Sequence, residues 1–170
     1  INTVLIPTVI DKKLYESNKV SHAKKSVITL GWVGVGKTYF KNGHLNILKE
    51  VFEILIERDI LFRFVLIGAM GDEKLKKFFT SDKYESEFID NLDWSISGVV
   101  AKTMKEREID IGLAPLENSE FSMAKCGFKI IEYMGVGVPV IASPVGEQGS
   151  ILESVGYIAK TPEEWANAII

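Results

Sequence analysis

The chain has 170 residues, of which 46% are hydrophobic and 25% charged, so it can form one compact domain with a core of two or three layers. Its formal net charge of -3 argues against a surface for nucleic acid or for an anionic membrane. The single cysteine, Cys126, excludes an internal disulfide framework and a cysteine metal cluster, and it indicates a reducing, cytoplasmic setting.

Residues 1–25 are predicted to be a connecting segment. The apolar stretch NTVLIPTVID is followed by KKLYESNKVSHAKKS, which is polar and rich in lysine and serine. The start of the chain does not have the pattern of a signal peptide, and the apolar runs are too short or too charged to span a bilayer, so we expect no membrane insertion by this domain. Because the chain lacks an initiator Met and stops within a helical pattern, EEWANAII, we expect an excised domain of a longer protein.

From Ser26 onward, apolar runs of strand length alternate with stretches of helical periodicity. The predicted strands span residues 26–34, 62–69, 86–92, 109–116, 138–143 and 156–160. The predicted helices span residues 45–57, 72–79, 97–107, 127–136 and 161–170, the last with a capping box from Thr161 to Glu164. This alternation predicts an α/β fold, a Rossmann-like doubly wound parallel sheet with helices on both faces. Ligands of such sheets bind beyond the carboxyl ends of the strands, near the point where strand order reverses.

The stretch GWVGVGKT, residues 31–38, has the spacing of a phosphate-binding P-loop. In a true P-loop a helix begins at the Gly-Lys-Thr, so that its first amides face the phosphates. Here the turn signal Asn42-Gly43 predicts that the helix begins only near His44 or Leu45, and Trp32 is bulky for a tight phosphate cradle. A P-loop nucleoside triphosphatase is therefore kept as an alternative function.

Three charged residues between positions 114 and 154 are spaced for a diphosphate site. Lys125, Lys129 and Glu132 are four and three residues apart, so a helix or its entering turn places them along one face. The helix starts after a strand end at Gly127 and Phe128, and a helix N-terminus with two nearby ammonium groups favours a diphosphate. Glu132 can accept two hydrogen bonds from a ribose diol. The alternative is an exposed Lys-Glu pair of little energetic consequence.

The segment KCGFKIIEYMGVGVPVIASPVG, residues 125–146, resembles the C-terminal signature of group 1 (family 4) glycosyltransferases, which have the GT-B architecture. The similarity extends to EIDIGLAPL, LDW and ITLGWVG, and VLIPTVID resembles the segment that enters the donor domain. The resemblance implies that residues 26–170 bind a nucleotide-diphosphate sugar and that an N-terminal acceptor domain is absent from this chain. It also implies a retaining, metal-independent transfer with no cofactor. In this family, membrane attachment usually depends on the acceptor domain.

The family's motif has two glutamates separated by seven residues. Glu132 matches the second, which contacts the ribose, whereas the first position, which contacts the donor sugar, falls on Ala124. Glu117 or Glu120 could replace it from the preceding loop. The missing glutamate keeps a non-catalytic nucleotide-sugar-binding module open as a further alternative.

The family also carries an arginine and a lysine after its first strand, which bind the diphosphate. Lys37 matches the lysine, and Trp32 stands in place of the arginine. The resulting donor site comprises Gly34, Lys37, Glu120, Lys125, Gly127, Phe128, Lys129 and Glu132.

The nucleotide base is expected near residues 92–95, against Leu92 and Trp94. No catalytic residue is assigned within this chain. Because the chain has only two histidines, His22 and His44, and no acidic cluster at metal spacing, no metal site is predicted.

Overall fold

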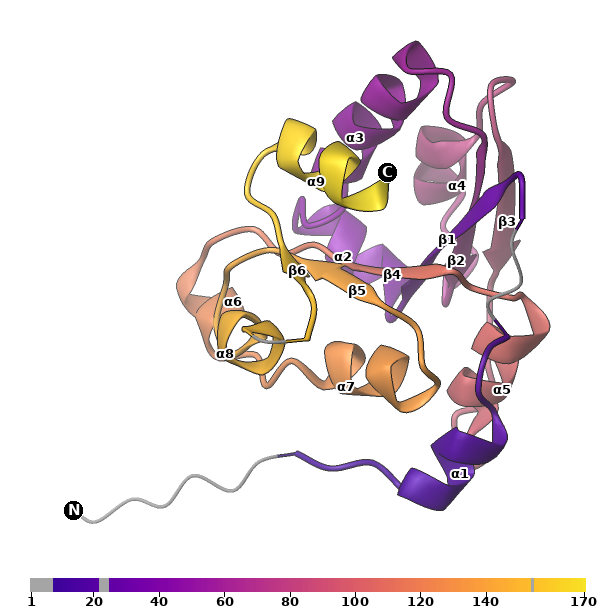
Figure 1. The fold of residues 1–170 in the computed structure, drawn as a ribbon, viewed down its shortest axis with the longest axis vertical. Helices are drawn as coiled ribbons and strands as arrows, with labels where there is room; N and C mark the ends of the chain where they lie inside the picture. Colours follow the sequence, from indigo (N-terminus) through magenta and orange to yellow (C-terminus); the bar gives the residue numbers. More distant parts are fainter. Residues whose placement is uncertain (1–7, 22–24, 154) are drawn as a thin grey trace.

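A computed structural model describes residues 8–21, 25–153 and 155–170 of the chain (Figure 1). Its centre is a parallel sheet in the order β3-β2-β1-β4-β5-β6. The strands are β1 (Ile28–Val33), β2 (Phe62–Ile67), β3 (Glu85–Ile89), β4 (Ile111–Ala114), β5 (Val140–Ala142) and β6 (Tyr157–Ile158). Since strand order reverses between β1 and β4, the sheet is doubly wound, and the predicted Rossmann-like α/β fold is confirmed.

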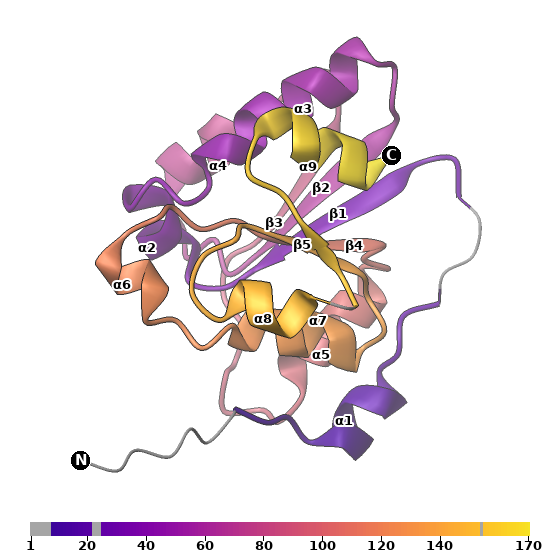
Figure 2. The same ribbon diagram turned by 60° about the vertical axis from the view of Figure 1, so that its left-hand side comes forward.

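Helices cover both faces of the sheet (Figures 1 and 2). On one face lie α3 (Asn46–Glu57), α4 (Glu73–Phe79) and α9 (Pro162–Ile169), and on the other lie α5 (Val99–Glu106), α7 (Phe128–Gly135), α8 (Gln148–Leu152) and α1 (Lys12–Ser17). Two further short helices, α2 (Gly36–Lys41) and α6 (Glu120–Met123), follow β1 and β4. The helix predicted over 161–170 is confirmed as α9, with the capping box between Thr161 and Glu164.

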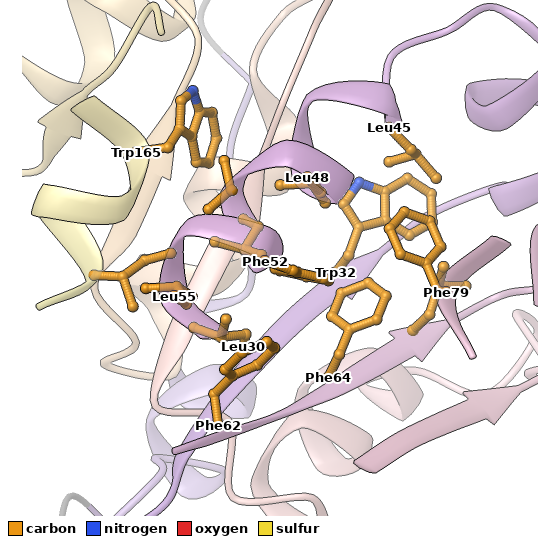
Figure 3. Packing of buried hydrophobic residues seen from close by; sticks show 14 of the residues in the cluster. Leu30, Trp32, Leu45, Leu48, Phe52, Leu55, Phe62, Phe64, Phe79 and Trp165 are labelled. Carbon is orange, nitrogen blue, oxygen red and sulfur yellow. The ribbon is translucent and has the colours of Figure 1, made fainter. Parts of the chain in front are cut away.

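The core on the α3 side is rich in aromatic rings (Figure 3). The ring of Phe52 in α3 lies 5.0 Å from that of Phe64 and 5.1 Å from that of Phe62, measured between centroids. Trp32 at the end of β1 is fully buried in this core. Its ring lies edge-on to that of Tyr39 in α2, with the centroids 5.2 Å apart, so this tryptophan of β1 serves packing.

Two local predictions need correction. The helix after β1 does not begin near His44 or Leu45 but at Gly36, and the Val35 carbonyl accepts hydrogen bonds from the amides of Thr38 and Tyr39. The Asn42-Gly43 turn separates this short α2 from α3 and does not precede the first helix. The strand predicted over 86–92 ends earlier, at Ile89.

Part of the predicted connecting segment packs against the domain. Asp11 caps α1 by accepting a hydrogen bond from the Leu14 amide, and the Val20 amide donates to the Val136 carbonyl at the end of α7. Residues 1–7 and 22–24 lie outside the described part of the chain, and with them lie His22 and most of NTVLIPTVID.

Candidate functional site

A cavity of about 620 Å³ opens beyond the carboxyl ends of β1 and β4, where strand order reverses. Seven of the ten residues predicted to bind donor or base line it: Gly34, Trp94, Lys125, Gly127, Phe128, Lys129 and Glu132. Three do not, because Lys37 and Glu120 are exposed on α2 and α6 and Leu92 packs against the core. The tertiary structure thus brings most of the predicted residues to one place.

The helix α7, which carries the central residues of the cavity, is fixed to the sheet by Tyr133. The Tyr133 hydroxyl donates to the Gly31 carbonyl at 3.1 Å and accepts from the Val33 amide at 3.0 Å. The ring covers Gly112 of β4, where a Cβ atom would lie 2.5 Å from ring carbon Cγ. This contact sets the start of α7 beside the end of β1.

The ammonium group of Lys129 is buried although the residue as a whole is partly exposed. Its Nζ lies 4.0 Å from the centroid of the Trp32 ring and 4.1 Å from that of Tyr39, and it has no hydrogen-bond partner among the described residues. Burial lowers the pKa of Lys129 well below its ordinary value, against the opposing effect of Glu132. A buried cation supported only by ring faces has unused donors for an anion.

A second cation stands beside the first. Nζ of Lys125, in the loop before α7, lies 4.9 Å from the centroid of Tyr39 and 4.6 Å from that of Phe121. Gly127 precedes α7 in a left-handed conformation with φ of 66°, and a Cβ atom there would lie 2.5 Å from Cδ1 of Ile151. Two ammonium groups and the positive end of the α7 dipole therefore share one wall of the cavity.

Glu132 lies on the same helix and is held by Tyr15, a residue that no sequence motif indicated. Its Oε1 accepts a hydrogen bond of 2.8 Å from the hydroxyl of Tyr15, which comes from α1 and also lines the cavity. Burial raises the pKa of Glu132, whereas the Tyr15 hydrogen bond and the Lys129 charge lower it. The Asp11 cap signal before KKLYES could have indicated α1, but no local pattern points from Tyr15 to a residue 117 positions away.

Another part of the cavity lining is apolar and accessible. Trp94 and Ile96 are both more than half exposed and line the cavity. Ala124 lines it as well, at the position where the resemblance would place a sugar-contacting glutamate. A flat apolar ligand group could lie against Trp94.

Glu117, one of the candidates to replace that glutamate, belongs to a neighbouring region. Its amide donates to Nδ1 of His44 at 3.1 Å, and both residues line a smaller cavity of about 260 Å³ with Lys160. Burial lowers the pKa of His44, and the charges of Lys125 and Lys129 add to that effect.

The glycine-rich loop after β1 uses its amides within the protein. The Gly34 amide donates to the Ile67 carbonyl at 3.0 Å, and the Gly36 amide donates to the Gly68 carbonyl at 2.8 Å. Gly68 lies so close that a Cβ atom on it would be 2.0 Å from the Gly34 oxygen. These amides do not form the open phosphate cradle of a P-loop.

In the described part of the chain no three His, Cys, Asp or Glu side chains are grouped as metal ligands would be. Within the same residues, no helix combines the length and the apolar character needed to cross a membrane.

Comparison with known proteins gave a family match over most of the chain. Residues 26–170 match the family model described as "Glycosyl transferases group 1". No curated protein sequence matches the chain.

Two examples of solved structures with a similar fold are trehalose-phosphate synthases. An alpha,alpha-trehalose-phosphate synthase (UDP-forming) from Burkholderia vietnamiensis gives a TM-score of 0.51 at 11% identity, over 85% of this chain and 34% of that one. The corresponding synthase from Burkholderia xenovorans, in complex with glucose-6-phosphate, gives a TM-score of 0.50 at 12% identity. The similarity covers 93% of this chain and 37% of that one. This chain therefore spans about a third of the length of these proteins.

Proposed function

The chain belongs to the group 1 glycosyl transferases, and we propose that residues 26–170 form the domain that binds a nucleotide-diphosphate sugar as the donor. One observation supports this assignment above the others. The ammonium of Lys129, which is buried and has no hydrogen-bond partner in the described part of the chain, lies at the N-terminus of α7, next to Lys125 and one turn before Glu132. This order of groups suits a diphosphate followed by a ribose.

The diphosphate lies, in this proposal, between Lys129, Lys125 and the first amides of α7. A phosphate oxygen would supply the acceptor that Lys129 lacks among the described residues. Lys37 is exposed and does not line the cavity, so it has a smaller role than the sequence suggested.

The ribose is bound by Glu132, whose second carboxylate oxygen is not engaged by Tyr15. The base lies against Trp94, as the sequence predicted, with Ile96 beside it in place of Leu92. Aromatic and apolar side chains of this kind hold a planar base without selecting its identity strongly.

Sugar transfer by this domain would be driven by stabilisation of the leaving nucleoside diphosphate. As the bond between sugar and phosphate breaks, negative charge grows on the diphosphate, where Lys129, Lys125 and the α7 dipole are already placed. We propose a retaining, metal-independent transfer to an acceptor held by a separate N-terminal domain. Residues 26–170 alone would bind nucleotide without turning it over.

We also place the domain in the cytoplasm, on the basis of its composition and single cysteine. Any membrane contact of the full-length protein would come from the acceptor domain.

The triphosphatase hypothesis is less well supported. Although α2 begins within GWVGVGKT, as a P-loop helix would, the amides of Gly34 and Gly36 are bonded to the end of β2. Lys37 is exposed outside the main cavity, so it is not placed to reach a phosphate bound there.

A thermal-shift measurement of the purified chain with UDP, GDP, ADP and ATP, each with and without magnesium, tests the proposal. A ligand that binds only the folded state raises its stability by mass action. We expect stabilisation by at least one nucleoside diphosphate without metal. Lys129→Met and Glu132→Gln should each weaken binding by about tenfold or more, because each removes a charge-assisted contact.

The exposed Lys77→Met, on α4, is the matched control and should bind as the wild type does. If the chain binds only ATP, and binds it only in the presence of magnesium, the result would contradict the proposal and favour a triphosphatase. Binding of nucleotide sugars without turnover by the longer protein would favour a non-catalytic module, consistent with Ala124.

A further inference from the structure

The short helix α1 is docked tightly against α5 and α7 (Figures 1 and 2). A Cβ atom on Gly135 of α7 would lie 2.4 Å from Cδ1 of Ile10 and 2.7 Å from Cδ1 of Tyr15. On the α5 side, a Cβ atom on Gly98 would lie 2.8 Å from Cδ1 of Leu14, and Nζ of Lys105 donates to the Ser17 carbonyl at 3.0 Å. Contacts with both helices fix the position of α1.

This docking places the Tyr15 hydroxyl in the wall of the main cavity. Tyr15 is 7% exposed, and its hydroxyl donates to Oε1 of Glu132 at 2.8 Å. Burial raises the pKa of Tyr15 and the neighbouring carboxylate raises it further, so the phenol remains a donor at neutral pH. The hydrogen bond restricts the rotation of Glu132 and occupies one of its two oxygens.

We propose that Tyr15 is a positioning residue of the nucleotide site, which holds the Glu132 side chain oriented so that the carboxylate receives the ribose hydroxyls. This inference rests on the proposed function and adds α1, from outside the region that matches the family model, to the site. Tyr15 contacts the carboxylate of Glu132, and in this proposal that carboxylate binds the ribose hydroxyls. Loss of the Tyr15 hydroxyl should therefore lower the affinity for ligands that have ribose hydroxyls and leave the affinity for ligands without them nearly unchanged.

Tyr15→Phe isolates the hydroxyl because the ring, and with it the packing against Gly135, is retained. The experiment measures dissociation constants by calorimetry for whichever of UDP, GDP and ADP binds best, and for its 2′,3′-dideoxy analogue. We expect Tyr15→Phe to weaken ribonucleotide binding by about five- to tenfold, because a Glu132 side chain without this hydrogen bond must lose its rotational freedom when the ligand binds. The dideoxy analogue should change by less than about twofold.

Tyr84→Phe is the matched control. It removes another buried hydroxyl, from the core on the opposite face of the sheet, where Tyr84 has no hydrogen-bond partner among the described residues. Its affinities for both ligands should equal those of the wild type.

A pH profile gives a second readout that packing alone would not change. The titratable groups around Glu132 are Tyr15 on α1 and Lys129 and Tyr133 on α7. Without the Tyr15 donor, the pKa of Glu132 should rise, so ribonucleotide affinity should begin to fall at a higher pH than in the wild type as the solution is acidified.

Three results would overturn the inference in distinguishable ways. Equal ribonucleotide affinity of Tyr15→Phe and wild type would show that the hydroxyl has no role, and the proposed function would stand. An equal loss for both ligands would show that Tyr15 acts through packing only. A wild-type chain that binds no nucleoside diphosphate would overturn the proposed function itself, and this inference with it.

Discussion

At the scale of single residues, the unusual group is the ammonium of Lys129. Ring faces of Trp32 and Tyr39 stabilise it electrostatically, yet they offer no hydrogen-bond acceptors. The pKa of Lys129 is lowered mainly by burial and further by Lys125, while Glu132 opposes the change. A bound diphosphate would favour the charged form, so the pKa should rise on binding.

This pKa change predicts that diphosphate binding takes up a proton. In the interval between the lowered pKa of the free chain and the higher pKa of the complex, free Lys129 is neutral and bound Lys129 is charged. Affinity should therefore fall as pH rises through this interval, by up to tenfold per pH unit for one proton. Calorimetry in two buffers with different ionisation enthalpies measures the number of protons taken up.

Lys129→Met should abolish this uptake, whereas Lys77→Met should leave it unchanged. If proton uptake persists in Lys129→Met, the group that titrates is a different one, and His44, whose pKa is also lowered, would be the next to substitute.

At the scale of elements, the contact between α1 and α7 depends on a glycine in the last turn of α7. Gly135 leaves room for the Tyr15 ring and for Ile10, and the helices could not approach as closely around a larger side chain. The sequence pattern of α7 does not show this, because a glycine near a helix end is equally typical of a C-terminal cap.

Gly135→Ala should therefore destabilise the chain although alanine favours a helix. The added methyl group would displace Tyr15 or Ile10, with an expected loss of about 1–3 kcal/mol in the free energy of unfolding. Urea unfolding measures the change.

Gly149→Ala inside α8 is the matched control. A Cβ atom there meets nothing within 4 Å, so the substitution should stabilise the chain by about 0.5–1 kcal/mol through helix propensity. Equal effects of the two substitutions would contradict a tight α1–α7 contact.

At the scale of the whole molecule, the two faces of the sheet contribute differently to stability and to the candidate site. The face under α3, α4 and α9 is a packed aromatic core, centred on Phe52 (Figure 3). The other face, under α5 and α7, supplies most of the walls of the main cavity, whereas Trp32 of the aromatic core contacts Lys129 of the cavity and Phe52 does not line it. Stability and nucleotide binding should therefore be separable by mutation.

Phe52→Ala tests this separation. Loss of the ring and the cavity that it leaves should lower the free energy of unfolding by about 3–5 kcal/mol. The affinity of the folded protein for a nucleoside diphosphate should remain that of the wild type, because Phe52 does not line the cavity. Urea unfolding and calorimetry at a temperature where the variant is folded measure the two quantities, and a parallel loss of affinity would contradict the separation.

Much of the fold was predictable because periodicity and capping are local properties. The run ITLGWV, the helix over residues 46–57 and the Thr161 cap each carry their signal within a few neighbouring residues. The short helices α1, α2, α6 and α8 were not predicted, since four to six residues are too few to show a helical period. For the same reason, the first helix after β1 was predicted to begin near His44 or Leu45, which is close to the start of α3, and the short α2 before it was missed.

For the candidate site, the chemistry of one segment, residues 125–132, was predictable from local sequence, because the spacing of Lys125, Lys129 and Glu132 follows from one helix and its entering turn. Which other residues join them depends on the tertiary structure. It placed Lys37 outside the cavity, closed Trp32 and Tyr39 around the Lys129 ammonium, and brought Tyr15 to Glu132 across 117 positions of the chain. The physical reason is that burial and pairing depend on contacts between distant segments, which have no counterpart in local sequence patterns.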